Sequence, residues 1–353
     1  MGESGRTWRL GISLLVLALI VAYFFLFPET LPAELGIRAQ WRISSEATGQ
    51  FSAVNEGIPF SFQDRFGYFS PDGRASAIGL SAGGTQISGE RYIQGDTATN
   101  SALFDAEGKL IGRIEGYGPF FVGNRLFSAT PDGLGLRAHD AFASAQWLYM
   151  FPSHLSAFNA SPTLAIGGTV DGTIEGVGLD GSRVFSFAPG GSRLQVILGL
   201  AISPNAKHIA AISGVDPQRL VVLGQGAGDY RVISHRYLDS DYREPVRVAF
   251  MPGDRYVLYR RPDGIGIWSI DGKVDELLPI TAEDFDVYYD EGRDLAYVAA
   301  RTRDSLSIIA FQPPTRILGR IELPVHSEFV HVDSSALYFG GMDGLYKLVF
   351  LEE

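Results

Sequence analysis

Cysteine is absent from the 353 residues of this sequence. Its absence excludes a disulfide framework, a thiolate metal site, a cysteine nucleophile and a lipid-modified N-terminal cysteine, so any membrane attachment has to come from the polypeptide itself. Basic residues are outnumbered, because 29 Lys and Arg against 40 Asp and Glu give a formal net charge of −11 at pH 7. Neutralisation of phosphates dominates nucleic-acid affinity, so we expect no nucleic-acid partner.

Sequence motifs of common enzymes are also lacking. We find no nucleophile elbow, Walker loop, dinucleotide-binding fingerprint or pair of metal-binding histidines in a suitable context. The six histidines are scattered, and the closest pair, His326 and His331, would point to opposite faces of a strand because their separation is odd. The sequence therefore predicts no catalytic residue, no cofactor and no metal site, and a protein without enzymatic activity is the favoured interpretation.

One long hydrophobic run is present near the N-terminus. Residues 10–27 (LGISLLVLALIVAYFFLF) carry no charge, and as a helix of about 1.5 Å per residue they roughly match the hydrocarbon thickness of a bilayer. Arg6 and Arg9 precede the run and Glu29 and Glu34 follow it, which places the N-terminus in the cytoplasm. A cleaved signal peptide is the alternative, but its apolar region is usually about 7–15 residues and ends in a small-x-small site.

We therefore expect a single-pass membrane protein with its main domain outside the cytoplasm, in the periplasm. The predicted division of the chain is a cytoplasmic N-terminus at residues 1–9, a transmembrane signal anchor at 10–27, a short linker at 28–39 and a globular domain at 40–353. A linker of 12 residues spans at most about 40 Å when extended, so the domain would work close to the membrane.

The region after the linker is predicted to be all-β. Short runs rich in Val, Ile, Tyr and Phe alternate with turns rich in Gly, Asp, Asn and Pro, and no helical periodicity of useful length appears. The clearest repeat is a unit of four short strands at residues 246–251 (VRVAFM), 256–261 (YVLYRR), 265–270 (IGIWSI) and 277–280 (LLPI).

Similar units precede and follow this one, which predicts a β-propeller. The last unit has three strands, so the segment 40–49 (QWRISSEATG) is expected to complete it and to cover its open edge. Residues 39–353 divided into seven units give about 45 residues each, within the roughly 40–50 residues expected per blade. We predict seven blades, with six or eight as alternatives, and treat residues 83–100 as an insertion in the first blade.

One turn carries a family resemblance. The segment 69–79 (FSPDGRASAIG) resembles the SPDG turn of TolB-type and WD-repeat-like propellers, and it is echoed at residues 161–163 (SPT), 203–207 (SPNAK) and 251–254 (MPGD). The resemblance implies a propeller architecture from residue 40 onward.

Two long connections supply candidate binding residues. Residues 83–100 and 235–245 (HRYLDSDYREP) are connections of the kinds that share one face of a propeller, and loops carry function disproportionately. Ordinary loop decoration is the competing interpretation. We select seven candidate partner-binding residues, of which the arginines and tyrosines are types enriched at interaction sites and the two aspartates belong to the second connection: Arg91, Tyr92, Tyr237, Asp239, Asp241, Tyr242 and Arg243.

Acidic residues cluster in two places. Asp239 and Asp241 could contribute ligands to calcium, although the segment lacks the spacing and glycine of an EF-hand loop. In segment 283–294, Asp284 and Asp286 alternate with apolar residues, so both carboxylates are expected on one face of an inner strand, where they would make the central channel acidic. Solvated turns on an acidic protein are the alternative for both clusters.

The function that the sequence favours is a protein-interaction scaffold or assembly factor of the cell envelope with a membrane-proximal protein partner. A sensor that binds a small ligand or calcium in the propeller channel is the first alternative. An extracytoplasmic hydrolase or lyase is the second, because acid–base catalysis needs two carboxylates in different environments and Asp284 with Asp286 is the one suggestion of such a pair.

Overall fold

The computed structural model describes residues 35–44, 57–62, 64–80, 85–96, 100–226, 229–325, 327, 329–333, 335–341 and 343–352. Within these ranges every element of regular structure is a strand, numbered β1 to β31, and no helix is long and apolar enough to cross a membrane. The predicted anchor at residues 10–27 lies outside the described residues.

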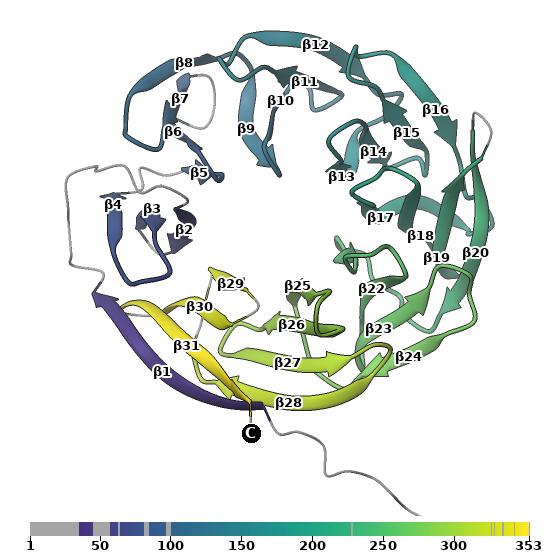
Figure 1. Cartoon of the computed structure of the whole chain (residues 1–353). Coiled ribbons are helices and arrows are strands. Elements are labelled where there is room, and N and C mark those ends of the chain that lie inside the picture. Colours follow the sequence, from purple (N-terminus) through teal and green to yellow (C-terminus); the bar gives the residue numbers. More distant parts are fainter. Residues whose placement is uncertain are drawn as a thin grey trace, which may run out of the picture.

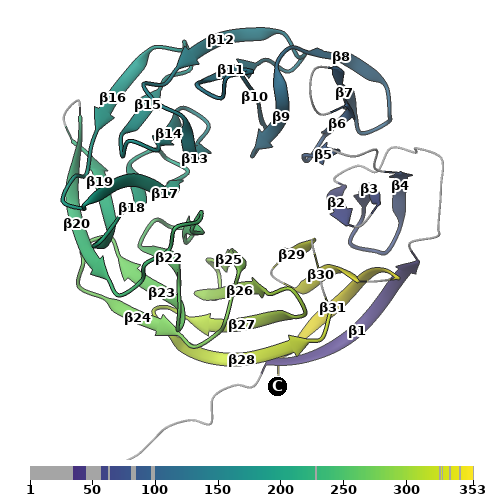
Figure 2. The same cartoon turned by 180° about the vertical axis from the view of Figure 1, so that it is seen from behind.

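The described strands form eight sheets arranged in a ring (Figure 1), which Figure 2 shows from behind. Each sheet is antiparallel. In seven of the eight sheets the first strand along the chain lies innermost, whereas in the sheet of β1, β31, β30 and β29 the innermost strand is β29. The prediction of an all-β propeller is confirmed.

The first four blades contain strands of two to six residues. Blade 1 holds β2 (Ile58–Phe62), β3 (Arg65–Phe69) and β4 (Ala75–Leu80). Blade 2 holds β5 (Gln86–Ile87), β6 (Arg91–Asp96), β7 (Asn100–Asp105) and β8 (Leu110–Ile114). Blade 3 holds β9 (Tyr117–Val122), β10 (Arg125–Ala129), β11 (Gly135–His139) and β12 (Ala145–Met150). Blade 4 holds β13 (Leu155–Ala160), β14 (Ala165–Thr169), β15 (Ile174–Val177) and β16 (Arg183–Phe187).

The last four blades contain most of the longer strands. Blade 5 holds β17 (Leu194–Ile202), β18 (His208–Val215), β19 (Gln218–Gln225) and β20 (Tyr230–Leu238). Blade 6 holds β21 (Val248–Phe250), β22 (Tyr256–Arg261), β23 (Gly264–Ser269) and β24 (Asp275–Leu278). Blade 7 holds β25 (Asp284–Asp290), β26 (Leu295–Arg301), β27 (Leu306–Gln312) and β28 (Arg316–Leu323). Blade 8 holds β29 (Val330–Val332), β30 (Ala336–Gly341), β31 (Gly344–Glu352) and β1 (Leu35–Ser44).

The predicted number of seven blades is wrong, because the segment expected as an insertion folds as strands. Within residues 83–100 the chain forms β5 and β6, which pair with each other and then with β7 to build a separate blade 2. The two residues of β5 are too few to show an alternating apolar pattern, so the sequence repeat is not visible there. Eight units over the same residues give about 40 residues each, still within the period of propellers.

The ring is closed by strands from the two ends of the described chain. β1 pairs antiparallel with β31 from Leu35 opposite Glu352 to Ser44 opposite Gly344, and it is the outermost strand of blade 8. The closing strand was expected at residues 40–49, and the observed strand begins within the predicted linker. Trp41 Nε1 and Lys347 Nζ both donate to the Pro71 carbonyl of blade 1, at 3.1 and 2.9 Å.

The turn that suggested the family resemblance recurs in the structure. At residues 70–74 the Ser70 hydroxyl donates to Asp72, and Gly73 has a φ of +91°, a left-handed conformation that favours glycine. The same hydroxyl–carboxylate pair occurs in turns of blades 3, 4 and 6, between Thr130 and Asp132, Thr169 and Asp171, and Ser269 and Asp271. The WD-repeat-like and TolB-like character of the blades is therefore confirmed.

Apolar side chains fill the space between neighbouring blades. Phe285 and Phe311 of blade 7 are fully buried with Met251 and Ile267 of blade 6 in one such cluster. Complete burial of a large apolar side chain is worth about 1.5–3 kcal/mol, so these clusters hold each blade against the next.

Candidate functional site

A cavity of about 280 Å³ lies along the innermost strands of blades 4 to 7. We call it the inner-strand cavity. Its walls are Ser156–Asn159 of β13, Leu198–Leu200 of β17, Pro245–Val248 at the start of β21, and Glu283 and Asp284 at the start of β25. Gly199 allows the walls to approach each other, because a Cβ there would lie 2.3 Å from the Val246 carbonyl oxygen.

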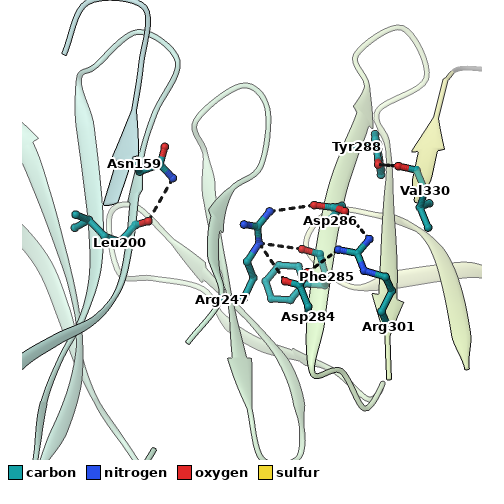
Figure 3. Close-up of polar contacts among 9 residues, drawn as sticks. All are labelled: Asn159, Leu200, Arg247, Asp284, Phe285, Asp286, Tyr288, Arg301 and Val330. Carbon is teal, nitrogen blue, oxygen red and sulfur yellow. Dashed lines mark hydrogen bonds and ion pairs between the residues drawn. The ribbon is translucent and has the colours of Figure 1, made fainter. Parts of the chain in front are cut away.

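Four charged side chains form an ion-pair network on one side of this cavity (Figure 3). Asp286 Oδ1 lies 3.0 Å from Arg247 Nη2, and Asp286 Oδ2 lies 2.7 Å from Arg301 Nη1. Asp284 Oδ1 lies 3.6 Å from Arg247 Nε, and Asp284 Oδ2 lies 2.6 Å from Arg301 Nη2. Each carboxylate therefore contacts both guanidinium groups.

Strand pairing produces this arrangement. Asp284 and Arg301 are directly opposite in the β25–β26 pair, so their side chains share one face of the sheet. Asp286 follows Asp284 on the same face, and Phe285 between them is fully buried on the other. The alternation of residues 284–287 is as the sequence predicts, but Arg247 and Arg301 balance the two carboxylates, so the four-residue network itself carries no net charge.

The network favours the charged state of Arg301. Burial alone would lower the pKa of Arg301, but the neighbouring Asp286 and Asp284 carboxylates more than offset burial and raise that pKa. A pair of catalytic carboxylates needs two different environments, whereas Asp284 and Asp286 share the same two partners. The geometry therefore favours a structural and binding role for the pair over acid–base chemistry.

Polar groups also join the innermost strands across the blade junctions, and Figure 3 includes three of these contacts. Four of the contacts run from a side chain to a main-chain carbonyl of the next blade. The fifth runs from a main-chain amide to a carbonyl of the preceding blade. The pairs are Ser156 Oγ to Ile197 at 2.6 Å, Asn159 Nδ2 to Leu200 at 3.3 Å, the Val246 amide to Leu198 at 2.8 Å, Arg247 Nε to Phe285 at 3.0 Å and Tyr288 Oη to Val330 at 2.7 Å.

The predicted loop residues after β20 gather at the junction of blades 5 and 6. Tyr237 is the penultimate residue of β20 and is 56% exposed, while Asp239, Asp241 and Arg243 follow it as exposed residues. Tyr242 is half-buried, and burial raises the pKa of its hydroxyl. Five of the seven predicted residues are therefore neighbours in the structure.

Contacts with strands of both blades hold this loop. Gln218 Nε2 donates to the Tyr242 carbonyl at 3.1 Å, and the Ser240 hydroxyl donates to Gln218 Oε1 at 2.6 Å. The Arg260 guanidinium lies 4.7 Å from the Tyr242 ring centre and forms an ion pair with Glu244 at 2.8 Å. The Gln218 contact restrains the loop backbone, and the Arg260 contacts restrain the side chains of Tyr242 and Glu244. The side chains of Asp239, Asp241 and Arg243 stay exposed.

The other two predicted residues do not lie in a loop, which corrects that expectation. Arg91 and Tyr92 begin β6 in blade 2, away from the junction of blades 5 and 6, because residues 83–100 fold as strands. Tyr92 is 3% exposed and stacks on Phe104 with ring centres 5.1 Å apart. Arg91 donates to the Asn124 carbonyl of blade 3 at 2.8 Å.

Arg91 belongs to a recurring arrangement that the sequence analysis did not identify. An arginine at or next to the start of the second strand reaches the first turn of the next blade. Arg125 Nη1 donates to the Ser161 carbonyl at 2.9 Å, and Arg255 Nη2 lies 3.1 Å from Asp294 Oδ1. The signal in the sequence is a basic residue directly after the first turn of several units.

Sequence reasoning also missed Arg247 and Arg301. Arg301 could have been found from the hairpin register, since pairing of residues 284–290 with 295–301 places it opposite Asp284. Arg247 comes from another blade, so no local pattern identifies it. Across the ranges that the structure describes, no three histidine, aspartate or glutamate side chains are placed to hold a metal ion, and this includes Asp239 and Asp241.

The ring of eight blades, seven with four described strands and blade 1 with three, defines a β-propeller together with its closure by β1 and the repeated turn. The chain belongs to a family of beta-propeller proteins, whose family model matches residues 8–352. An uncharacterized protein of Treponema pallidum (strain Nichols) is 24% identical over 229 residues, which cover 64% of this chain and 60% of that protein. The match therefore spans less than two thirds of the length of that relative.

Two solved structures show the same fold. BamB from Moraxella catarrhalis aligns with a TM-score of 0.62 at 14% identity, over 89% of this chain and 99% of that chain. The WD40 domain of Toxoplasma gondii coronin aligns with a TM-score of 0.56 at 11% identity, over 92% of this chain and 88% of that chain. At these identities the likeness concerns the fold.

Proposed function

We propose that this protein is a non-enzymatic, membrane-anchored propeller that acts as a protein-interaction scaffold or assembly factor in the cell envelope. The partner would bind at the loop of residues 239–245 together with Tyr237. The observation that carries the proposal is the combination of a restrained loop backbone with exposed side chains at the junction of blades 5 and 6.

This combination lowers the cost of binding. Gln218 already holds the loop backbone at Tyr242, and Arg260 holds the side chains of Tyr242 and Glu244, so a partner would order little more than the remaining side chains. Tyr237 offers a large amphipathic ring, which the guanidinium of Arg219 covers at 5.7 Å from the ring centre. Tyrosine and arginine are among the residue types that most often dominate binding energy at protein interfaces.

The uncharged run at residues 10–27 supports the anchoring part of the proposal. With Arg6 and Arg9 on its N-terminal side, the propeller would lie outside the cytoplasm, in the periplasm. Seven residues, 28–34, separate the run from β1, and they span at most about 25 Å. A partner in or near the membrane is therefore the one within reach.

The partner proposal is tested by crosslinking in cells that produce the full-length protein, followed by affinity purification from their membranes. The test variant carries Asp239→Lys and Asp241→Lys, and the matched control carries Glu276→Lys on the exposed outer strand β24. We expect a defined complex with the wild type and the control and its loss with the test variant. Equal recovery of the same proteins with the test variant would contradict the proposed surface.

The location is tested separately. Membranes of the same cells are washed at alkaline pH, and intact spheroplasts are treated with protease. We expect the protein to stay in the washed membranes and the propeller to be digested from outside. Release by the wash, or protection of the propeller until the cells are lysed, would contradict the anchor or its orientation.

A further inference from the structure

Arg247 presents an unused edge of its guanidinium group to the inner-strand cavity. Its Nε donates to the Phe285 carbonyl and its Nη2 donates to Asp286 Oδ1, both at 3.0 Å. Nη1 has no hydrogen bond to a described residue, and Figure 3 shows the free edge on the side that faces Asn159. The side chain is 43% exposed, so Arg247 is fixed in place with one nitrogen available to an acceptor from solution.

The charges around Arg247 restrict what that acceptor can belong to. Glu283 also lines the cavity, is exposed, and its side chain forms no ion pair or hydrogen bond with a described residue. Arg247 and Arg301 supply two positive charges, whereas Glu283, Asp284 and Asp286 supply three negative charges, so the local net charge is −1. A simple anion would be repelled, and a simple cation would leave Arg247 Nη1 without a partner.

We propose that the inner-strand cavity binds a small zwitterion of the amino-acid class. The ligand carboxylate would accept a hydrogen bond from Arg247 Nη1, and the ligand ammonium group would pair with Glu283. A molecule with both charges satisfies both Arg247 and Glu283, because each of its charged groups meets an opposite charge. The Glu283 main-chain amide donates to the Arg301 carbonyl at 2.8 Å, so the backbone at Glu283 is fixed to β26, the strand that carries Arg301.

The dimensions and the opposite wall fit a small ligand. A volume of about 280 Å³ lies just below the roughly 300–1,000 Å³ of pockets for drug-sized molecules. On the opposite wall the Ser156 hydroxyl and the Asn159 amide donate to the carbonyls of Ile197 and Leu200. Neither the hydroxyl nor the amide carries a charge, so recognition of the ligand charges falls to Arg247 and Glu283.

The experiment is isothermal titration calorimetry of the full-length protein at pH 7 and low ionic strength. The probes are glycine, L-alanine, β-alanine and γ-aminobutyrate, whose ammonium and carboxylate groups are separated by increasing distances. Acetate and methylammonium are the single-charge probes. We expect at least one zwitterion to bind, and each single-charge probe to bind at least about tenfold more weakly, a difference that each lost charge contact can supply.

Two substitutions test the assignment of residues. Glu283→Gln and Arg247→Lys should each weaken zwitterion binding at least about tenfold, whereas the controls Glu276→Gln and Arg231→Lys on exposed residues should leave it unchanged. Since the Glu283 side chain forms no ion pair or hydrogen bond with a described residue, Glu283→Gln tests binding without the loss of a structural interaction. Absence of binding by all four zwitterions, equal binding of a single-charge probe, or an unchanged affinity in Glu283→Gln would overturn the proposal.

Discussion

Adjacent residues of β25 belong to two regions with different chemistry. Phe285 is fully buried in the apolar cluster between blades 6 and 7, whereas Asp284 and Asp286 on either side of it form ion pairs beside the inner-strand cavity. Side chains of a strand alternate between its two faces, so one strand contributes to both regions. The difference teaches that the stability of the ring and the chemistry of the cavity depend on alternate residues and can be changed separately.

The largest expected effect is on the buried face. Phe285→Ala should lower the free energy of unfolding by about 3–5 kcal/mol, because it removes apolar contacts and leaves a cavity between two blades. Urea unfolding followed by fluorescence measures the change. The control is Phe142→Ala, at a phenylalanine that is 72% exposed, which should change stability by less than about 0.5 kcal/mol. A loss below about 1 kcal/mol for Phe285→Ala would show that this cluster does not hold the blades together.

The second effect is on the charged face of the same blade. Arg301→Gln removes the hydrogen bonds to Asp284 and Asp286, at 2.6 and 2.7 Å, and leaves both carboxylates to Arg247. Hydrogen bonds to charged groups contribute roughly 1.5–3 kcal/mol, and we expect a loss of stability in this range. Arg231→Gln, at an exposed arginine of β20, is the control and should have no measurable effect. If the two substitutions behave alike, the ion-pair network does not contribute to stability.

A third effect should depend on pH, at the next junction along the ring. His331 of β29 lies against Tyr288 of β25 and against Tyr338, with ring centres 6.0 Å apart in both pairs. Burial lowers the pKa of His331, although the charge of Asp333 opposes this. As the pH falls below about 6.5, the unfolded chain binds the proton first, so stability is lost until the pH reaches the lower pKa of the folded state.

This pH dependence is measured as the difference between the wild type and His331→Gln in unfolding experiments from pH 8 to pH 5. The wild type should lose more stability than the variant over this interval, since the variant lacks the titrating group. Parallel curves for the two proteins would show that His331 is not buried in solution as it is in the structure.

Much of the fold could be predicted from the sequence because each blade repeats the same local pattern. The four strands of blade 6 and the closing role of a strand near Trp41 follow from short apolar runs, turn residues and an incomplete last unit. The blade count failed at β5, because a strand of two residues carries no periodicity. The error moved Arg91 and Tyr92 from an expected loop to the start of β6.

The candidate site was predictable only where it is local. The shared face of Asp284 and Asp286 follows from the alternation of β25, and the exposed loop after β20 follows from its polar composition. Arg247 lies in another blade, 39 residues from Asp286, and the contact between them depends on how two blades pack. Sequence patterns describe single blades, so the balance of charge at the cavity appears only in the assembled ring.

The smallest expected effect tests the comparison at a residue directly beside Phe285. Asp284→Asn keeps the shape of the side chain but removes its charge, and the wild-type carboxylate is 51% exposed, so its ion pairs are screened by water and salt. We expect a loss of about 0–1 kcal/mol, and this loss should shrink as sodium chloride is raised. Asp304→Asn, at an exposed carboxylate without an ion pair to a described residue, is the matched control. A loss for Asp284→Asn as large as that for Phe285→Ala would mean that the two faces of β25 cannot be changed separately, because the strand would then depend on its charged face as much as on its apolar one.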